Sequence, residues 1–493
     1  MNLRKIYILI LALGIITLGA CNKWIDEKIN IDPDRPSVND VTMDLILPAV
    51  QARMAYDLGG YNTVVPACMW SQQVSGIGVQ SSGLETYEYA ANEGNNLWNF
   101  IYSGTLMDAK QIIILSKKEG NSPHFRGVAK ILTAITLGNT TDVWGDIPYS
   151  QALEGVENLA PKFDKQEEVY REIINLLDQA IVELKAEENL YQLKGDLIFS
   201  GETKKWIAAA HTLKARYLLH KSKRDPNVYN EILEFINNGI VDNSGDCKFI
   251  FSTSPTGSNP IFQFDDQRSD HIRACETTVA LLREPRIPQG GTLEIPKDLR
   301  LPKYVFPVED DFTIKLENPA RDTIIKKGSY FGNLPGYSLS ESSRLGPAVN
   351  SAAAAVYFTS YSENELIKAE AQWSKGEFQN ARTSLVNAVI SSLQRNDVYD
   401  ADWVSKYETA ITPLTGEDLY KEIIVQRNLC LYFTLEVFND FRRTNNALGL
   451  KPIPGNKLGD KFPKRYFYPD DEIAYNRNTP ITPITEPVWW DKQ

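Results

Sequence analysis

The stretch from Tyr361 to Leu393 decides the fold class of this chain, and it reads YSENELIKAEAQWSKGEFQNARTSLVNAVISSL. Its apolar residues recur at helical spacing on both sides of Gly376, which marks a turn between two helices. Ala369, Ala381 and Ala388 place small side chains where two antiparallel helices would approach each other closely. The stretch therefore predicts a helix hairpin.

The spacing of those alanines matches the small-residue positions of a tetratricopeptide repeat. One such hairpin cannot bury its own apolar face, so further helix pairs must stack on it. Helical periodicity recurs earlier in the chain over residues 42–58, 98–118, 124–139, 165–188, 203–223 and 227–238. We therefore expect a mainly α, tetratricopeptide-like scaffold of about four stacked pairs.

Residues 241–360 have a different character, with many prolines and glycines and no long helical run. We expect loops with short strands there, at Lys248–Ser252 and Pro260–Asp265. Long irregular segments inside a globular protein are usually functional or disordered, and the Tyr, Phe and Pro content favours order. The expected organisation is one domain over 42–493, with helical repeats over about 42–240 and 361–445 and a loop-rich insertion over about 241–360.

The first residues resemble an export signal, with Arg4 and Lys5 ahead of the apolar run Ile6–Leu18. That run spans about 20 Å as a helix, which is shorter than the roughly 30 Å of a bilayer core. The segment Leu18-Gly19-Ala20-Cys21 is similar to a bacterial lipobox, so we expect a signal peptide at 1–20 and a diacylglycerol on Cys21. Residues 21–41 would then form a polar tether. The alternative is a secreted protein in which Cys21 stands there by accident.

Composition excludes several functions. A net charge of −11 disfavours nucleic acid and anionic lipid as electrostatic partners. Cys68, Cys247, Cys275 and Cys430 are too widely spaced for a metal or redox motif and are expected to be buried apolar fillers rather than a disulfide framework. The four histidines form no metal motif, and no cofactor is expected. A structural calcium ion near Asp265, Asp266 and Asp270 is a weak alternative.

Several motifs occur in order along the chain. They are Asp142–Leu153 (DVWGDIPYSQAL), Gln426–Asn428 (QRN), Leu435–Phe438 (LEVF), Asp440–Asn445 (DFRRTN) and Phe462–Pro469 (FPKRYFYP). Together with the lipobox and the alanine hairpin, they resemble the SusD/RagB family of nutrient-binding outer-membrane lipoproteins of Bacteroidota. The likeness runs over nearly the whole chain.

This resemblance implies a lipid-anchored protein exposed on the surface of the outer membrane. Such a protein would capture an oligosaccharide and deliver it to a SusC-like TonB-dependent transporter. Alternatives are a peptide ligand, a mainly structural lid on the transporter, and a glycoside hydrolase. The chain has no nucleophile elbow, phosphate loop or dinucleotide fingerprint, and paired acids such as Asp265–Asp266 or Asp310–Asp311 are common in so acidic a protein. We expect a binding protein rather than an enzyme.

A sugar site needs aromatic faces for the C–H side of the rings and planar polar groups for the hydroxyls. The segment 61–100 offers both, and the resemblance adds the insertion as a source of contacts. The predicted ligand-binding residues are Tyr61, Trp70, Gln72, Tyr87, Asn96, Trp98, Tyr330 and Tyr337. The charged residues of the C-terminal motifs lie on a helix that is apolar nearly all round, and we expect them to pair within the scaffold: Arg427, Glu436, Asp440, Arg442 and Arg443.

Overall fold

The predicted hairpin is formed by α14 (Tyr361–Ser374) and α15 (Phe378–Arg395) in the computed structural model, which describes residues 41–118, 120–317 and 320–492. Ala369, Ala381 and Ala388 are fully buried where the two helices meet. Gly376 takes a positive φ of 75° in the turn, a conformation that glycine adopts without strain. The signal peptide and Cys21 lie outside the described residues.

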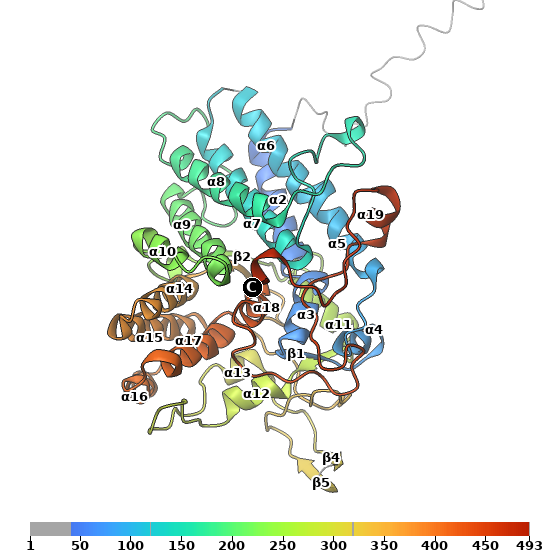
Figure 1. Cartoon of the computed structure of the whole chain (residues 1–493), viewed down its shortest axis with the longest axis vertical. Helices are drawn as coiled ribbons and strands as arrows, with labels where there is room; N and C mark the ends of the chain where they lie inside the picture. Colours follow the sequence, from blue (N-terminus) through green and yellow to red (C-terminus); the bar gives the residue numbers. More distant parts are fainter. Residues whose placement is uncertain (1–40, 119, 318–319, 493) are drawn as a thin grey trace, which may run out of the picture.

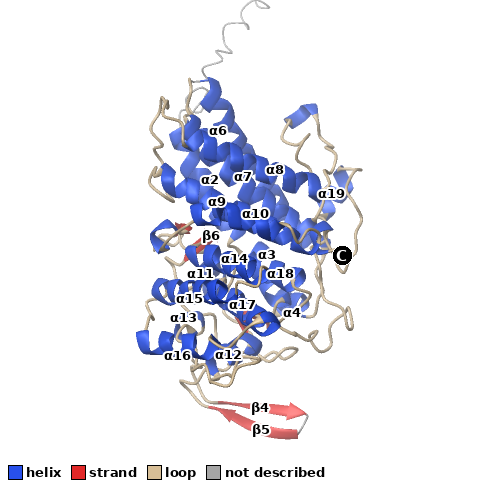
Figure 2. Ribbon diagram, turned by 60° about the vertical axis from the view of Figure 1, so that its left-hand side comes forward, coloured by secondary structure: helices blue, strands red, loops and turns tan. Residues whose placement is uncertain are grey.

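The helices on either side of this hairpin follow one another as packed neighbours (Figure 1). One group holds α2 (Met43–Leu58), α6 (Met107–Lys118), α7 (Pro123–Trp144), α8 (Gln166–Leu184), α9 (Thr203–His220) and α10 (Val228–Phe235). The second group holds α14, α15, α16 (Ala401–Ile411) and α17 (Gly416–Cys430), and α10 packs on α14. Figure 2 shows the two groups stacked along the long axis. The prediction of a mainly α, tetratricopeptide-like scaffold is confirmed.

The segment between α2 and α6 differs in detail from the expected single helix over 98–118. It contains α3 (Tyr61–Trp70), β1 (Val74–Gly76), α4 (Val79–Glu85), α5 (Asn95–Phe100) and the π-helical segment η3 (Ile101–Leu106). The helical segment therefore begins at Asn95, before Trp98. It passes through about one and a half turns of wider π-helix in η3 and then continues as α6. Such π-helical turns are rare and frequently occur at functional sites.

The segment 241–360 contains short strands, as expected, and also short helices that were not expected. They are β2 (Cys247–Ile250), α11 (Pro260–Gln267), β3 (Ile272–Ala274), α12 (Glu276–Arg283), α13 (Leu301–Tyr304), β4 (Phe312–Glu317), β5 (Ala320–Ile325) and β6 (Ala355–Thr359). The strands pair antiparallel as β1–β3, β2–β6 and β4–β5. The β4–β5 hairpin projects from the lower end in both views (Figures 1 and 2).

The predicted strand at Pro260–Asp265 is wrong, because this segment is helical. The Asn259 side chain accepts hydrogen bonds from the backbone N–H groups of Ile261 and Phe262 and so caps the helix. Pro260 occupies the first turn, where its missing N–H leaves no hydrogen bond unmade. The alternation of apolar and polar residues over this short run does not separate a strand from one helical turn and a half.

Helix α18 (Leu435–Arg443) lies at the centre of the molecule with all of its residues buried. Its charged side chains reach several other elements. Asp440 pairs with Arg427 of α17 at 2.7 Å, Arg443 pairs with Glu370 of α14 at 2.5 Å, and the Glu436 carboxylate lies 2.9 Å from His220 of α9. The C-terminal motifs therefore hold the scaffold together through buried ion pairs.

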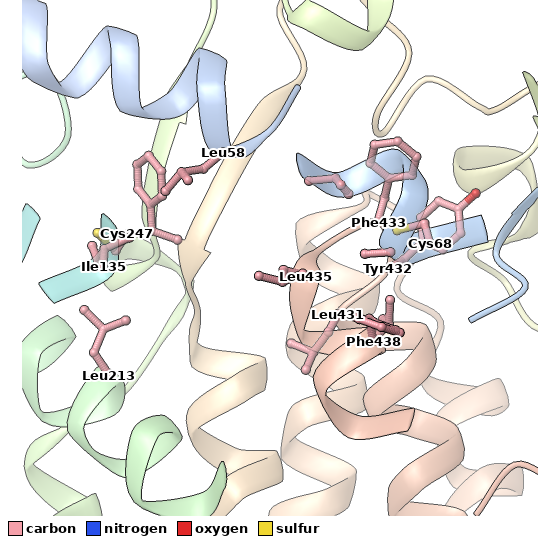
Figure 3. Packing of buried hydrophobic residues seen from close by; sticks show 14 of the residues in the cluster. Leu58, Cys68, Ile135, Leu213, Cys247, Leu431, Tyr432, Phe433, Leu435 and Phe438 are labelled. Carbon is pink, nitrogen blue, oxygen red and sulfur yellow. The ribbon is translucent and has the colours of Figure 1, made fainter. Parts of the chain in front are cut away.

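Buried apolar side chains form one large cluster along the molecule and a smaller one at α9, α10 and α14. Figure 3 shows two parts of the large cluster, with Leu58 and Cys247 in one and Cys68, Leu431 and Phe433 in the other. Cys68, Cys247, Cys275 and Cys430 are all buried with free thiols, which confirms their role as fillers in the described chain. In that same part, none of the helices combines the length and apolar character needed to cross a bilayer.

Candidate functional site

Four of the eight predicted ligand-binding residues are buried in the core. Trp70 is fully buried, and its ring packs edge-on against those of Tyr89, Phe438 and Tyr466. The Trp98 ring packs edge-on against Trp144, with 5.1 Å between centroids. These aromatic residues leave no open ring face for a sugar.

The polar members of the buried four bind the protein itself. The Gln72 amide donates to the carbonyl of Lys451 at 2.5 Å and accepts from the Thr277 hydroxyl. The Tyr87 hydroxyl accepts a hydrogen bond from the backbone N–H of Ile453 at 3.1 Å. Both residues have positive φ angles, so they shape the loops in which they stand.

The other four predicted residues reach the surface, and of these four only Tyr61 lines the cleft described below. Asn96 is exposed, and Tyr330 and Tyr337 are half-buried in the insertion. Tyr61 is half-buried at the start of α3 and lines a surface cleft of about 170 Å³. This cleft is formed where α2 ends, α3 begins, and α5 and α11 meet them. Its lining residues are Tyr56, Asp57, Gly60, Tyr61, Asn62, Leu97, Phe100, Pro260, Gln263, Phe264, Gln267 and Arg268.

Aromatic rings define the shape of the cleft. The Tyr61 and Phe264 rings stack with 4.2 Å between centroids and 25° between planes, and the Arg268 guanidinium lies 5.5 Å from the Phe264 centroid. At the rim, Tyr56 is 44% exposed and Phe100 is 38% exposed. Exposed aromatic rings beside a concave surface offer the apolar faces onto which sugar rings pack.

Planar polar groups stand between these rings. Asn62, Gln263 and Gln267 supply carboxamides, and the Gln263 amide nitrogen already donates one hydrogen bond to the Ser258 carbonyl at 2.7 Å. The Tyr61 hydroxyl lies 2.7 Å from the Ser81 hydroxyl of α4, which fixes the tyrosine ring. The cleft therefore combines aromatic faces, amides and one arginine, which is the donor set that recognises vicinal hydroxyl groups.

The π-helical segment η3 positions one wall of this cleft. Gly104 of η3 lies against the Arg53 guanidinium, and a Cβ at Gly104 would come within 2.2 Å of its central carbon. Arg53 in turn lies 5.4 Å from the Phe100 ring centroid and 3.8 Å from the Asp57 carboxylate. The widened turn thus makes room for an arginine that orients a rim aromatic and a carboxylate.

Asp57 provides a pH-dependent feature of the cleft. Burial raises its pKa from the usual 3.8 to about 6, although the Arg53 guanidinium opposes the shift. The folded protein therefore keeps a proton on Asp57 between about pH 4 and 6, where the unfolded chain releases it, so stability falls as pH rises through this window. We expect Asp57→Asn to lack this fall and to be about 2 to 3 kcal/mol more stable than wild type at pH 7.

The measurement is urea unfolding of both proteins at pH 4 and pH 7. The two proteins should differ by the full amount at pH 7 and by only a small amount at pH 4, which lies close to the unfolded pKa of 3.8, so that little of the difference has yet developed. Parallel pH dependences for wild type and Asp57→Asn would contradict the assignment.

A larger cavity of about 420 Å³ lies between the two helix groups, next to β2 and β6. Its lining mixes aliphatic side chains such as Leu58, Val356 and Leu431 with charged and amide groups and with several aromatic rings. The Tyr304 and Tyr432 rings at this cavity stack on each other at 4.3 Å, so they cover each other's faces. The larger of two pockets is the usual first choice, but the aromatic residues that line this cavity are buried or half-buried. Tyr56 and Phe100 are exposed at the smaller cleft, and for this reason we take the smaller cleft as the candidate site.

Asp265, Asp266 and Asp270, which the sequence offered as a weak calcium site, do not form a shared set of carboxylate ligands. Asp265 is buried, and its carboxylate accepts hydrogen bonds from Arg344 and from Asn350. Asp266 and Asp270 are exposed.

The described residues do bring together Asp142, His220 and Glu436, three groups of metal-ligating type. Donors already hold this trio. The Trp490 indole N–H and the Tyr170 hydroxyl donate to Asp142, and the Asn439 amide donates to both carboxylates. Burial raises the pKa of Asp142, whereas His220 and Arg216 outweigh burial and hold the pKa of Glu436 well below its usual range. The trio belongs to the ion network around α18.

Sequence reasoning found Tyr61 but missed most of the cleft. Tyr56 stands in a helix whose apolar pattern suggests packing. Phe264 lies in the segment predicted as the strand Pro260–Asp265, and Gln267 and Arg268 follow that segment directly. Gly104, a glycine inside an otherwise helical run, is a local signal from which this region could have been recognised.

A family model described as "Starch-binding associating with outer membrane", for SusD-like proteins, matches residues 35–469. A solved chitin-binding protein superposes with a TM-score of 0.76 at 21% identity, covering 92% of this chain and 100% of that one. A SusD/RagB family protein from Bacteroides thetaiotaomicron gives 0.72 at 23% identity, with 92% and 99% covered. A chitin-binding SusD homolog from Flavobacterium johnsoniae gives 0.72 at 19%, with 91% and 98% covered. No curated protein sequence matches the chain.

Proposed function

The chain belongs to the SusD-like family of outer-membrane-associated proteins, and from this membership we propose that it binds an oligosaccharide at the cell surface. In this proposal it is a lipoprotein, anchored through a diacylglycerol on Cys21, that passes its ligand to a TonB-dependent outer-membrane transporter. The expected SusC-like partner would accept the ligand beneath the bound protein. Fold likeness at the identities found supports the scaffold, and the site must be argued from its own residues.

The observation that carries the proposal is the make-up of the cleft between α2, α3, α5 and α11. Tyr56 and Phe100 offer partly exposed rings at the rim, while Asn62, Gln263 and Gln267 offer amides beside them. Rings bind the C–H faces of a pyranose, and amides exchange paired hydrogen bonds with neighbouring hydroxyls. A volume of about 170 Å³ holds a single sugar residue closely, so a longer glycan would extend over the surface on either side.

Binding without turnover fits this geometry. Glycoside hydrolysis requires two carboxyl groups flanking the scissile bond, about 5 to 10 Å apart. Within the described lining of the cleft, Asp57 is the single carboxyl group, and its inner oxygen is buried. The cleft therefore lacks the acid and base partners of a hydrolase.

N-acetylglucosamine oligomers are the first ligands to test. Two of the structural relatives are described as chitin-binding, and carboxamides such as those of Asn62 and Gln267 pair well with acetamido groups. A peptide ligand is the alternative, because backbone amides would also bind the three cleft carboxamides.

The test is titration calorimetry on the soluble form that starts at Asn22. Starch, chitin and other glycan oligomers and a set of apolar and polar peptides would be compared at equal concentrations. Glycan binding that quenches or shifts tryptophan or tyrosine fluorescence, with no product after long incubation, is the expected result. If only peptides bind, the ligand is a peptide and not a glycan. Release of free sugar would contradict the proposal that the protein binds without hydrolysing.

Co-purification of the acylated protein from outer membranes with a large barrel protein tests the proposed delivery to a transporter. Absence of such a barrel would contradict the delivery step.

A further inference from the structure

We propose that one end of the molecule, where residue 41 enters α2, makes a second contact with the membrane. Its exposed apolar side chains would lie in the lipid headgroup region. This proposal rests on the lipid anchor of the proposed function. It assigns a task to a set of exposed apolar residues that the ligand cleft does not use. We call this set the apolar end and define it as Leu45, Ile114, Leu190, Tyr191 and Leu197.

The residues of the apolar end are brought together by the ends of four helices. The start of α2, the end of α6, the start of α7 and the end of α8 lie at the upper end in Figures 1 and 2. The loop after α8 crosses this end. Its Leu190 N–H donates to the carbonyl of Asn121 before α7, and its Leu197 N–H donates to Gln51 of α2. The first described residue, 41, enters α2 at the same place.

The exposure of these side chains is large for residues of their type. Leu190 is 62% exposed, Leu45 is 60% exposed and Leu197 is 54% exposed. Single exposed leucines need no explanation, but several at one end of a molecule indicate a surface that is covered in use. Tyr191 adds an aromatic ring with a polar tip, the residue type that is enriched where membrane meets water.

The apolar end carries less net negative charge than the chain as a whole, which favours its contact with lipid headgroups. The exposed cations there are Lys117, Lys118, Lys185 and Lys194, and the exposed acids are Asp44, Glu187 and Glu188. This end is therefore close to neutral on a chain whose net charge is −11. Lysine stems lie along apolar surface while their ammonium groups reach phosphates, so these lysines can border an inserted leucine set.

The lipid anchor allows the apolar end to contact the membrane even if its own membrane affinity is low. The segment from 21 to 41 reaches at most about 70 Å when fully extended, so an acylated Cys21 keeps the body close to the bilayer. Tethering converts membrane contact into an intramolecular event, and a surface too weak to bind membranes alone then becomes occupied. A body resting on this end would direct the β4–β5 hairpin, at the opposite end, away from the bilayer (Figure 2).

The experiment uses the full-length acylated chain in vesicles of phosphatidylethanolamine with a minor fraction of phosphatidylglycerol. Leu190→Cys and Ile324→Cys would each carry an environment-sensitive NBD label, since Ile324 on β5 is 61% exposed and lies at the far end. The four cysteines of the described chain are buried and should not react with the label in the folded protein. We expect quenching by doxyl-labelled lipid to be at least twofold stronger at 190 than at 324.

A variant tests whether the apolar side chains cause the contact. With the label moved to Leu45→Cys, adding Leu197→Asp and Tyr191→Asp should remove most of the quenching, while the circular dichroism spectrum stays unchanged. Equal quenching at 190 and 324 would overturn the proposal, and so would quenching at 190 that appears only when the transporter is added, because the surface would then contact protein.

Mass spectrometry of Cys21 and the oligosaccharide titration keep this test separate from the proposed function. An acylated chain that binds sugar but shows equal quenching refutes the membrane contact alone. A chain without the acyl group refutes the anchor, and the contact with it.

Discussion

Arg443→Met is expected to lower the free energy of unfolding by about 3 to 5 kcal/mol, the usual cost of removing one partner from a buried ion pair. Arg443 donates to both oxygens of Glu370, at 2.5 and 2.9 Å, and to Asp440 at 2.8 Å. The side chains of Arg443 and Glu370 are 1% and 0% exposed, so water cannot replace the lost guanidinium. Burial lowers the pKa of Arg443, but the two carboxylates outweigh burial and hold this pKa above its usual value.

Urea unfolding followed by far-ultraviolet circular dichroism measures this change, with Lys492→Met as the matched control. Lys492 pairs with Glu486 at 2.9 Å, but both side chains are nearly half exposed, so its loss should cost less than about 1 kcal/mol. The double variant Arg443→Met, Glu370→Met should be more stable than Arg443→Met alone, because no uncompensated buried carboxylate remains at Glu370. A loss below 1 kcal/mol for Arg443→Met would contradict the role given to these pairs.

The helical scaffold was predictable because its signals are local. The α14–α15 hairpin is indicated by apolar periodicity, by one glycine turn and by two alanines 12 residues apart, and all of these signals lie within a single stretch of chain. The hydrophobic spacing of α8 and α9 is equally continuous. Boundaries such as the start of α5 depend on the π-helical turn at Ile101–Leu106, which no repeating pattern encodes.

The role of helix α18 was predictable from composition but its partners were not. An apolar helix that also carries Glu436, Asp440 and Arg443 must pair its charges internally, because buried charges without partners are too costly. Glu370 and Arg427, however, are 73 and 13 residues from their partners in the chain. Pairing across such separations is decided by how the helices stack, and a single sequence holds no record of it.

The candidate site was predicted least well because the same aromatic residue types fill cores and form binding surfaces. Trp70 and Trp98 stand in the same segment as Tyr61, yet their rings point into the core whereas Tyr61 meets Phe264 of α11 at the surface. The sequence predicts a strand for the segment that holds Phe264, and a strand there gives no reason to expect contact with α3. The cleft exists because two segments about 200 residues apart meet, and that meeting is a property of the fold.

Phe264→Ala is expected to weaken oligosaccharide binding by about 10- to 100-fold, the range of a well-packed aromatic contact. Phe264 supports Tyr61 through the 4.2 Å stack and holds the Arg268 guanidinium, so its loss disturbs a ring face and a donor together. Gln267→Ala removes only an exposed amide from the same helix and should cost less, up to about tenfold. Titration calorimetry of each purified variant gives the dissociation constants.

The controls for this prediction separate the cleft from the residues that the sequence alone suggested. Tyr475→Ala removes an aromatic ring that is 82% exposed outside the cleft, and it should leave affinity unchanged. Tyr330→Ala and Tyr337→Ala test the two insertion tyrosines, which lie outside the cleft lining. Strong loss in either of these, with wild-type affinity in Phe264→Ala, would move the site from the α3–α11 cleft to the insertion. Because all of these side chains are at least partly exposed, their variants should fold, and a change in affinity reports a change at the binding site rather than unfolding.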